Sequence, residues 1–126
     1  MADDEAQARR DAASQVGFSA VARAFEPIQR LHGFVPEVDE IREAMRAGDL
    51  RRVPDLVTDR MLETFAVVGT PAQARQRYAE RFAGVYDEPL LLCPCMGVDR
   101  GRLREGMAAM VEAFAPLASR DNRRQQ

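Results

Sequence analysis

Four places in the 126-residue chain carry side chains whose types could take part in chemistry. They are the single histidine His32, the step Gly69-Thr70, the acidic pair Asp87 and Glu88, and the segment Cys93-Pro94-Cys95-Met96-Gly97. Histidine can act as a general base or a metal ligand near neutral pH, and a backbone turn that enters a helix can bind phosphate. Each candidate therefore has a functional interpretation and a structural one.

For His32 and Thr70 we favour the structural interpretation. His32 lies in a Leu-His-Gly-Phe turn without an Asp, Ser or Cys beside it, so we expect a structural or solvent-facing side chain. Thr70 precedes Pro71, and Gln73 follows at the spacing of a capping box. We expect Thr70 to cap a helix rather than hold an anion, since the Gly69-Thr70 loop is too short to wrap around one.

The two cysteines are separated by one proline. Redox and zinc motifs use the Cys-x-x-Cys spacing, and a structural zinc site needs a second pair of ligands. We therefore expect no metal site here and two buried, reduced thiols. One side chain of the segment 93–97 could still line a pocket.

Composition indicates one globular domain. The chain is 46% hydrophobic and 30% charged, with a net charge of −2, and it has no basic surplus of the kind that nucleic-acid binding needs. No apolar run approaches the ~20 residues of a membrane helix. The first fifteen residues lack the apolar core of a signal peptide. We expect a cytoplasmic protein with neither nucleic acid nor membrane as a partner.

Five helices are predicted from apolar spacing and from the positions of proline and glycine. They run from about Asp11 to Phe25, with Pro27 ending the helix; from Pro36 to Gly48; from Pro54 through Leu62; from Pro71 to Gly84; and from Leu103 to Leu117. Met107 and Met110 fall at the core spacing of the last helix. Residues 1–10 and 119–126 are polar, and we expect them to be disordered tails.

Two short apolar runs predict β-strands. Thr64–Val68 is followed by a glycine, and Leu90–Cys93 lies between two prolines. Nearly continuous apolar runs of this length are typical of strands covered on both faces. With the helix between them they indicate a strand–helix–strand unit with a right-handed crossover.

The stretch from Pro54 to Pro94 carries an ordered series of features: PDLVTDRML, then FAVVGTP, an arginine-containing helix, a glycine, and an apolar run ending in proline. In this order it resembles the luciferase-like monooxygenase family, whose members are flavin- or deazaflavin F420-dependent oxidoreductases. The positions that carry the match are Gly69, Thr70, Pro71, Arg77, Gly84 and Pro94. The upstream run QVGFSAVARAFEPIQRLHGF is also similar to the helical stretch that precedes this block, so the resemblance spans about residues 10–118.

The resemblance implies an α/β fold, a partial (β/α)8 barrel that is helix-rich and contains two short parallel strands. Residues 11–118 would form the C-terminal part of the barrel domain, its last two βα units, since a full barrel takes about 250 residues. We therefore expect a truncated or split flavin- or F420-dependent monooxygenase or dehydrogenase that is inactive alone. The alternative is a non-catalytic helical interaction module derived from the same part of the barrel.

The matched positions are helix caps, helix ends and packing residues, so we assign no catalytic or cofactor-binding residue. On such a barrel, segment 93–97 would lie at the active-site face, and Asp87 and Glu88 at the opposite, stabilising face. FMN or F420 is the implied cofactor, and we expect this chain alone to bind it weakly. Open strand edges lead us to expect a homo-oligomer or a partner chain that supplies the remaining strands.

Overall fold

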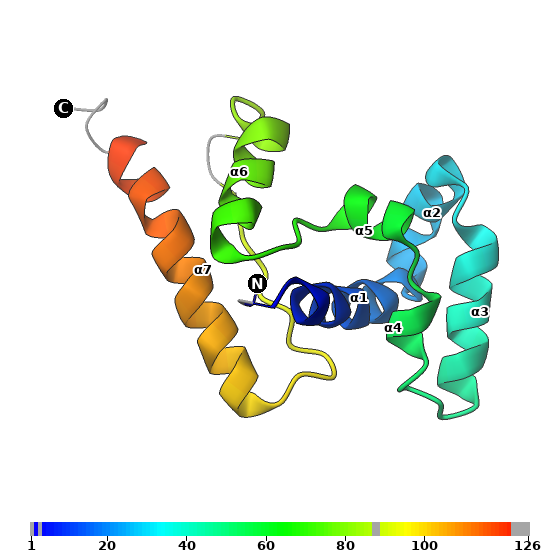
Figure 1. Ribbon diagram of the computed structural model, residues 1–126. Helices are drawn as coiled ribbons and strands as arrows, with labels where there is room; N and C mark the ends of the chain where they lie inside the picture. Colours follow the sequence, from blue (N-terminus) through cyan, green and yellow to red (C-terminus); the bar gives the residue numbers. More distant parts are fainter. Residues whose placement is uncertain (1, 3, 87–88, 122–126) are drawn as a thin grey trace.

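The computed structural model describes residues 2, 4–86 and 89–121, and for 116–121 it describes the backbone alone. In this part of the chain all regular structure is helical (Figure 1). The elements are α1 (Glu5–Ala20), a 3₁₀ turn η1 (Arg23–Phe25), α2 (Glu26–His32), α3 (Val35–Arg46), α4 (Val53–Leu56), α5 (Asp59–Phe65), α6 (Pro71–Phe82) and α7 (Arg100–Asp121). Figure 1 shows α1 near the centre, with α2, α3 and α4 on one side of it and α6 and α7 on the other.

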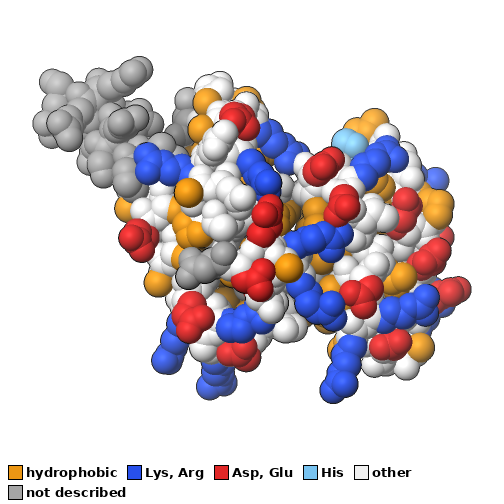
Figure 2. Space-filling model, in the orientation of Figure 1, with side chains coloured by type: hydrophobic (Ala, Val, Ile, Leu, Met, Phe, Trp, Pro, Cys, Tyr) orange, Lys and Arg blue, Asp and Glu red, His pale blue; other side chains and the backbone are white. Residues whose placement is uncertain are grey.

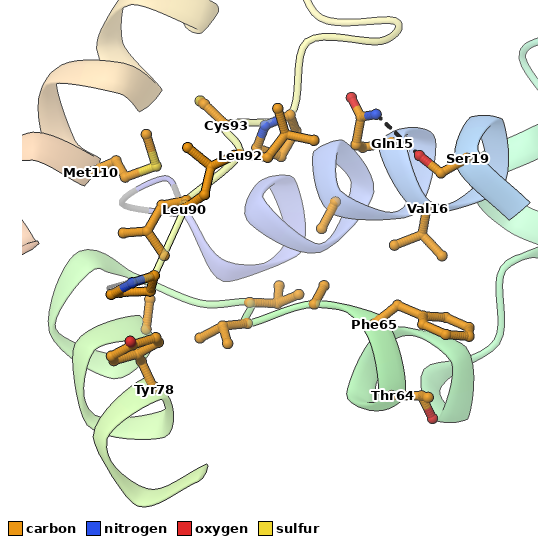
Figure 3. A pocket seen from close by; sticks show the side chains of 18 of the residues that line it. Gln15, Val16, Ser19, Thr64, Phe65, Tyr78, Leu90, Leu92, Cys93 and Met110 are labelled. Atoms are coloured by element: carbon orange, nitrogen blue, oxygen red, sulfur yellow. Dashed lines mark hydrogen bonds between the residues drawn. The ribbon is translucent and has the colours of Figure 1, made fainter. Parts of the chain in front are cut away.

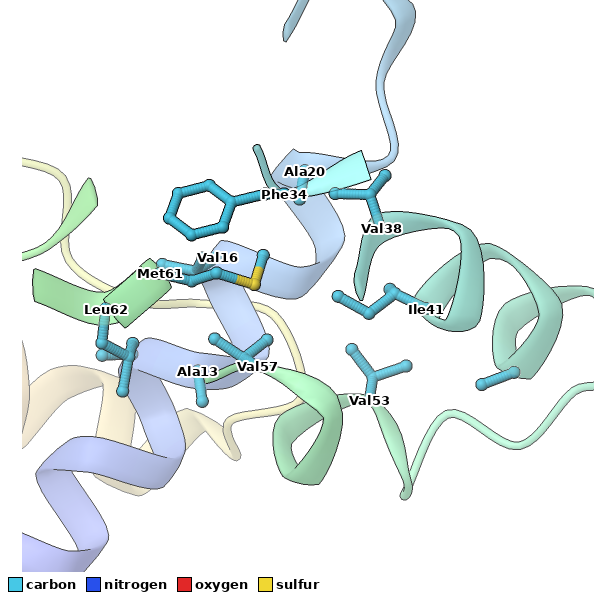
Figure 4. Packing of buried hydrophobic residues seen from close by; sticks show 12 residues of the cluster. Ala13, Val16, Ala20, Phe34, Val38, Ile41, Val53, Val57, Met61 and Leu62 are labelled. Atoms are coloured by element: carbon cyan, nitrogen blue, oxygen red, sulfur yellow. The ribbon is translucent and has the colours of Figure 1, made fainter. Parts of the chain in front are cut away.

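The hydrophobic core lies where α1 meets α3, α4 and α5 (Figure 4). Its largest fully buried side chains are Phe34, Ile41, Met61, Val38, Val53 and Val57. Full burial of a side chain of this size stabilises the fold by about 1.5–3 kcal/mol. The face that α1 turns to the core is made of small residues, so the neighbouring helices approach its backbone closely.

The first helix differs from the prediction at both ends. α1 begins at Glu5 rather than Asp11, because the carboxylate of Asp4 accepts hydrogen bonds from two first-turn N–H groups and caps the helix. α1 ends at Ala20. Pro27 does not end this helix; it lies in the first turn of α2, where its missing N–H costs nothing.

The single helix predicted from Pro54 through Leu62 is two helices. Val57 is extended, with ψ 113°, and Thr58 caps a new helix by accepting a hydrogen bond from the backbone N–H of Met61 at 3.3 Å. Threonine side chains compete in this way with helical continuation of the backbone. Val57 and Met61 both remain in the core, so the apolar stripe was predicted correctly although the backbone breaks within it.

The predicted α/β fold, a partial barrel with two short parallel strands, is wrong. The described residues contain no strand. Phe65 ends α5, and the extended residues after it form no ladder with a neighbouring segment. The carbonyls of Ala66 and Val68 accept hydrogen bonds from Arg81 and Arg77 of α6 instead.

The second predicted strand, residues 90–93, is irregular as well. Both runs lie along the same groove between helices. An apolar run predicts burial against some surface but does not identify that surface. Helices partly cover the first run, whereas Leu90 and Leu92 of the second run remain exposed.

Three predictions of local structure are confirmed. Pro36 lies in the first turn of α3, and α7 covers the predicted last helix. Thr70 and Gln73 form the capping box at the start of α6: the N–H of Gln73 donates to the Thr70 hydroxyl at 3.4 Å, and the Gln73 side chain accepts from the Thr70 N–H at 2.9 Å. Within the described residues, no helix combines the length and apolarity that crossing a bilayer requires.

Candidate functional site

A groove of about 630 Å³ lies between α1, residues 64–68, α6, residues 89–94 and α7 (Figure 3). In the space-filling view a notch separates the part of the molecule that contains α6 from the part that contains α2 and α3 (Figure 2). The volume is in the range of small-molecule binding sites, which are mostly apolar with a few polar groups. Six of the lining residues are aromatic: Phe25, Phe65, Tyr78, Phe82, Tyr86 and Phe114.

The two ends of the groove differ. Figure 3 shows Leu90 and Leu92 near Met110 of α7 at one end, with Tyr78 of α6 beside them. Tyr78 is also held edge-on against the ring of Phe114, with 5.3 Å between ring centroids. The other end is formed by α1, α2 and the end of α5.

At this second end lies Gln29, a buried polar side chain. Gln29 belongs to α2, is 3% exposed and lines the groove. Its Oε1 atom has no hydrogen-bond partner. A buried acceptor without a partner lowers the stability of a fold by about 1–3 kcal/mol. Gln29 therefore destabilises the folded chain.

The basic side chain of the lining, Arg81, is already engaged. Its guanidinium donates to the backbone carbonyls of Glu63, Thr64 at 2.5 Å and Ala66 at 3.3 Å. The last carbonyls of a helix lack N–H donors within the helix. At the end of α5, Arg81 provides these donors. Three of the five N–H donors of Arg81 are therefore already used.

Gln15 and Arg102 fasten the loop before α7 onto α1. The Gln15 Oε1 atom accepts hydrogen bonds from the backbone N–H of Cys95 at 3.2 Å and of Met96 at 3.4 Å. Arg102 forms an ion pair with Asp11 of α1. These contacts hold the wall of the groove that carries Cys93 against α1.

Both cysteines are free thiols. Cys93 is half-buried and lines the groove, the possibility that the sequence left open for one side chain of segment 93–97. Burial raises the pKa of the Cys93 thiol, so at neutral pH it is protonated and a weak nucleophile. Cys95 is exposed, contrary to the expectation that both thiols are buried. Among the described residues, no three His, Cys, Asp or Glu side chains gather as a metal ion would need.

His32 lies outside the groove. Its ring stacks on Phe34 with 5.8 Å between centroids and meets the edge of Phe65 at 5.9 Å. Its backbone carbonyl accepts a hydrogen bond from Arg60 at 2.6 Å. These are packing contacts, in keeping with the structural role proposed for His32.

The other candidates are dispersed. Thr70 is half-buried, and both its hydroxyl and its N–H are used by the capping box. Asp87 and Glu88 lie outside the described residues. Met107 is 49% exposed rather than buried, whereas Met110 lines the groove.

Sequence reasoning missed Gln29, Gln15 and Arg81. Polar and charged residues flank both glutamines at helical spacing, Asp11 before Gln15 and Glu26 before Gln29, so neither position stands out in the sequence as a buried polar contact. Arg81 gave no sign, because an arginine on an amphipathic helix is ordinarily solvated.

The described residues form a helical protein with one large, mostly apolar groove. A family model described as luciferase-like monooxygenase matches residues 1–88. Since the match covers more than half of the chain, the chain belongs to the luciferase-like monooxygenase family. The match does not place the chain in the C-terminal part of that family. No curated protein and no solved structure matches the chain.

The family generally uses flavin or F420 cofactors, and both FMN and F420 carry phosphate groups. The groove fits the apolar part of such a molecule by volume and by its aromatic rings. It offers few groups for the phosphate, because Arg81 gives three of its five N–H donors to carbonyls and the N–H groups of Thr70 and Gln73 are bonded within the capping box. The described residues therefore do not form a complete site for either cofactor.

Proposed function

We propose that this chain contributes an apolar wall to a flavin- or F420-dependent oxidoreductase of the luciferase-like family and binds neither cofactor tightly by itself. One observation carries the proposal: the groove is large and aromatic, yet its basic side chain, Arg81, is committed to backbone carbonyls. In such an enzyme the residues of the groove would exclude water and position an apolar group. The phosphate would be bound by groups outside the described residues.

A titration tests the proposal directly. Purified chain is expected to bind FMN or F420 with a dissociation constant above about 10 μM, because losing the phosphate contacts removes several kcal/mol of binding free energy. FMN fluorescence and F420 absorbance report the complex. Riboflavin, which lacks the phosphate, is the matched control and should bind about as well as FMN. One-to-one FMN binding below 10 μM that riboflavin does not reproduce would show that the chain has its own phosphate site.

We also propose that the chain works as a homo-oligomer or with a partner chain. Large apolar side chains remain exposed beside the groove: Leu90 is 98% exposed, Leu92 71% and Val111 64%. Exposed apolar patches of this kind commonly mark protein interfaces.

Sedimentation velocity from about 1 to 100 μM is expected to show association that rises with concentration. The double variant Leu90→Asp, Leu92→Asp should shift the chain toward monomer, because a charged side chain is expensive to bury at an interface. The matched control is Leu50→Asp, also at an exposed leucine but distant in sequence from this surface, and it should leave association unchanged. A single monomeric species over the whole range would contradict the proposal.

That outcome would favour the second candidate function, a non-catalytic helical interaction module. The observation in its favour is that α1, α3, α4 and α5 enclose a continuous core without help from another chain. In that case the exposed apolar side chains would serve a different protein rather than a second copy of this chain.

A further inference from the structure

We propose that residues 90–93 pair with the same residues of a second copy of this chain, so that two copies associate through a short antiparallel two-stranded ribbon. The inference rests on the proposed homo-oligomer and names the contact that builds it. Within a single chain, as far as the structure describes it, the segment belongs to no strand. Its unused backbone groups, its exposure and its flanking prolines carry the inference.

The backbone of the segment is unpaired. Residues 89–94 run without a turn or bend along the groove (Figure 3). Among the described residues, no hydrogen bond engages an N–H or carbonyl group of residues 90–94, and the first bonds after them join Cys95 and Met96 to Gln15. Extended backbone with free N–H and carbonyl groups is a template for pairing with another strand.

The exposure of the segment alternates with a period of two, as it does along a strand. Leu90 is 98% exposed and Leu92 71%, whereas Leu91 and Cys93 are half-buried. A residue that is 98% exposed has its backbone in solvent as well as its side chain. In extended backbone the N–H and carbonyl groups of residues two apart point to the same edge. The groups of Leu90 and Leu92 therefore share one accessible edge.

This edge favours one register, in which Leu91 faces Leu91 of the second copy as a non-hydrogen-bonded pair. Leu90 then faces Leu92 of the second copy, and each such pair exchanges two hydrogen bonds, so every N–H and carbonyl group of both residues is used. A register centred on Leu92 would bring Pro94, which has no N–H, into a hydrogen-bonded position. A register centred on Leu90 would move the two Leu92 side chains apart.

The composition of the segment suits a second copy of itself. No residue from 89 to 98 is charged, so two such segments approach without repulsion, whereas strand edges that avoid pairing commonly carry charges. In the favoured register, Leu90 and Leu92 of both copies form one apolar cluster of four side chains. Pairing of identical surfaces about a two-fold axis is the commonest way in which identical chains associate.

Disulfide cross-linking tests the register. In a Cys93→Ser, Cys95→Ser background, Leu91→Cys is expected to form a covalent dimer on mild oxidation, because facing Cα atoms of a non-hydrogen-bonded pair are about 4.5 Å apart. Leu90→Cys and Leu92→Cys should each give several-fold less dimer alone, since each lies diagonal to its own counterpart at about 7–8 Å. Mixed in equal amounts, these two should cross-link as facing residues. Non-reducing gel electrophoresis measures the yields.

A second pair of variants separates backbone pairing from apolar contact. Leu92→Ala and Leu92→Pro both delete the leucine side chain, but only the proline removes the N–H. The dissociation constant of the dimer, measured by sedimentation, is expected to be about 30-fold higher for Leu92→Pro than for Leu92→Ala, because two hydrogen bonds are lost per dimer.

Leu90 and Leu92 are exposed, so the mixed pair decides the question even if circular dichroism shows that Leu91→Cys does not fold. No cross-linked dimer in the mixture, or an equal yield from Leu90→Cys or Leu92→Cys alone, would overturn the inference. Equal dissociation constants for Leu92→Pro and Leu92→Ala would do the same. If wild-type chain still associates in these cases, the homo-oligomer proposal stands on another contact; a wild-type chain that stays monomeric overturns both.

Discussion

Replacing Phe34 with alanine is expected to lower the free energy of unfolding by about 3–5 kcal/mol, the usual cost of deleting a fully buried phenylalanine. Phe34 is 0% exposed and contacts Phe65 edge-on, with 5.7 Å between centroids. The guanidinium of Arg60 lies over its ring at 4.8 Å. Loss of the ring would leave a cavity between α3 and α5 that rigid helices cannot close.

Urea unfolding followed by circular dichroism at 222 nm measures this loss. Phe25→Ala is the matched control, because it deletes the same ring from η1, where Phe25 is 46% exposed. The control variant should lower the free energy of unfolding by clearly less, about 1 kcal/mol, since the Phe25 ring buries less apolar surface on folding. Equal losses for the two variants would mean that α3 and α5 do not pack on Phe34 as the structure has them.

Gly17→Ala is expected to destabilise the chain by about 1–3 kcal/mol, as overpacking of a tight core does. The direction of this change in stability is informative, because alanine normally stabilises a helix interior by about 1 kcal/mol relative to glycine. Here a Cβ atom would lie 2.5 Å from Val53 Cγ1 and 3.2 Å from Val57 Cγ2. Both valines are buried, so α4 would have to move away from α1.

A double-mutant cycle separates this steric effect from helix propensity. Val53→Ala removes the Cγ1 atom that Gly17→Ala would meet. In that background, Gly17→Ala should be close to neutral or stabilising, although Val53→Ala alone costs stability through its cavity. A loss from Gly17→Ala that is the same in both backgrounds would show that the close approach of α1 and α4 is not its cause.

The local features of this protein were accessible from its sequence. Thr70 and Gln73 predicted a capping box because that motif needs only residues three positions apart. Pro36 predicted the start of α3 for a similarly local reason. The ordered features from Pro54 to Pro94 also indicated the family, and the family match confirms it.

The extended runs show where sequence alone was insufficient. Thr64–Val68 and Leu90–Cys93 have the composition of buried strands, but a strand exists only where a neighbouring backbone supplies hydrogen bonds. That neighbour is a property of the tertiary structure. Arginine side chains from α6 donate hydrogen bonds to backbone carbonyls of the first run, and both runs line a groove.

The candidate site was decided by the tertiary structure alone. Gln29, Arg81 and Cys93 are far apart in the chain, and no spacing rule relates them. The sequence determined the helix caps, the apolar stripes and the family, since each of these depends on neighbours along the chain or on an ordered pattern. Only the packing of α1 against distant segments decided which side chains surround the groove, that Arg81 is committed to carbonyls and that the Gln29 oxygen has no partner, because burial and hydrogen bonding depend on neighbours in space.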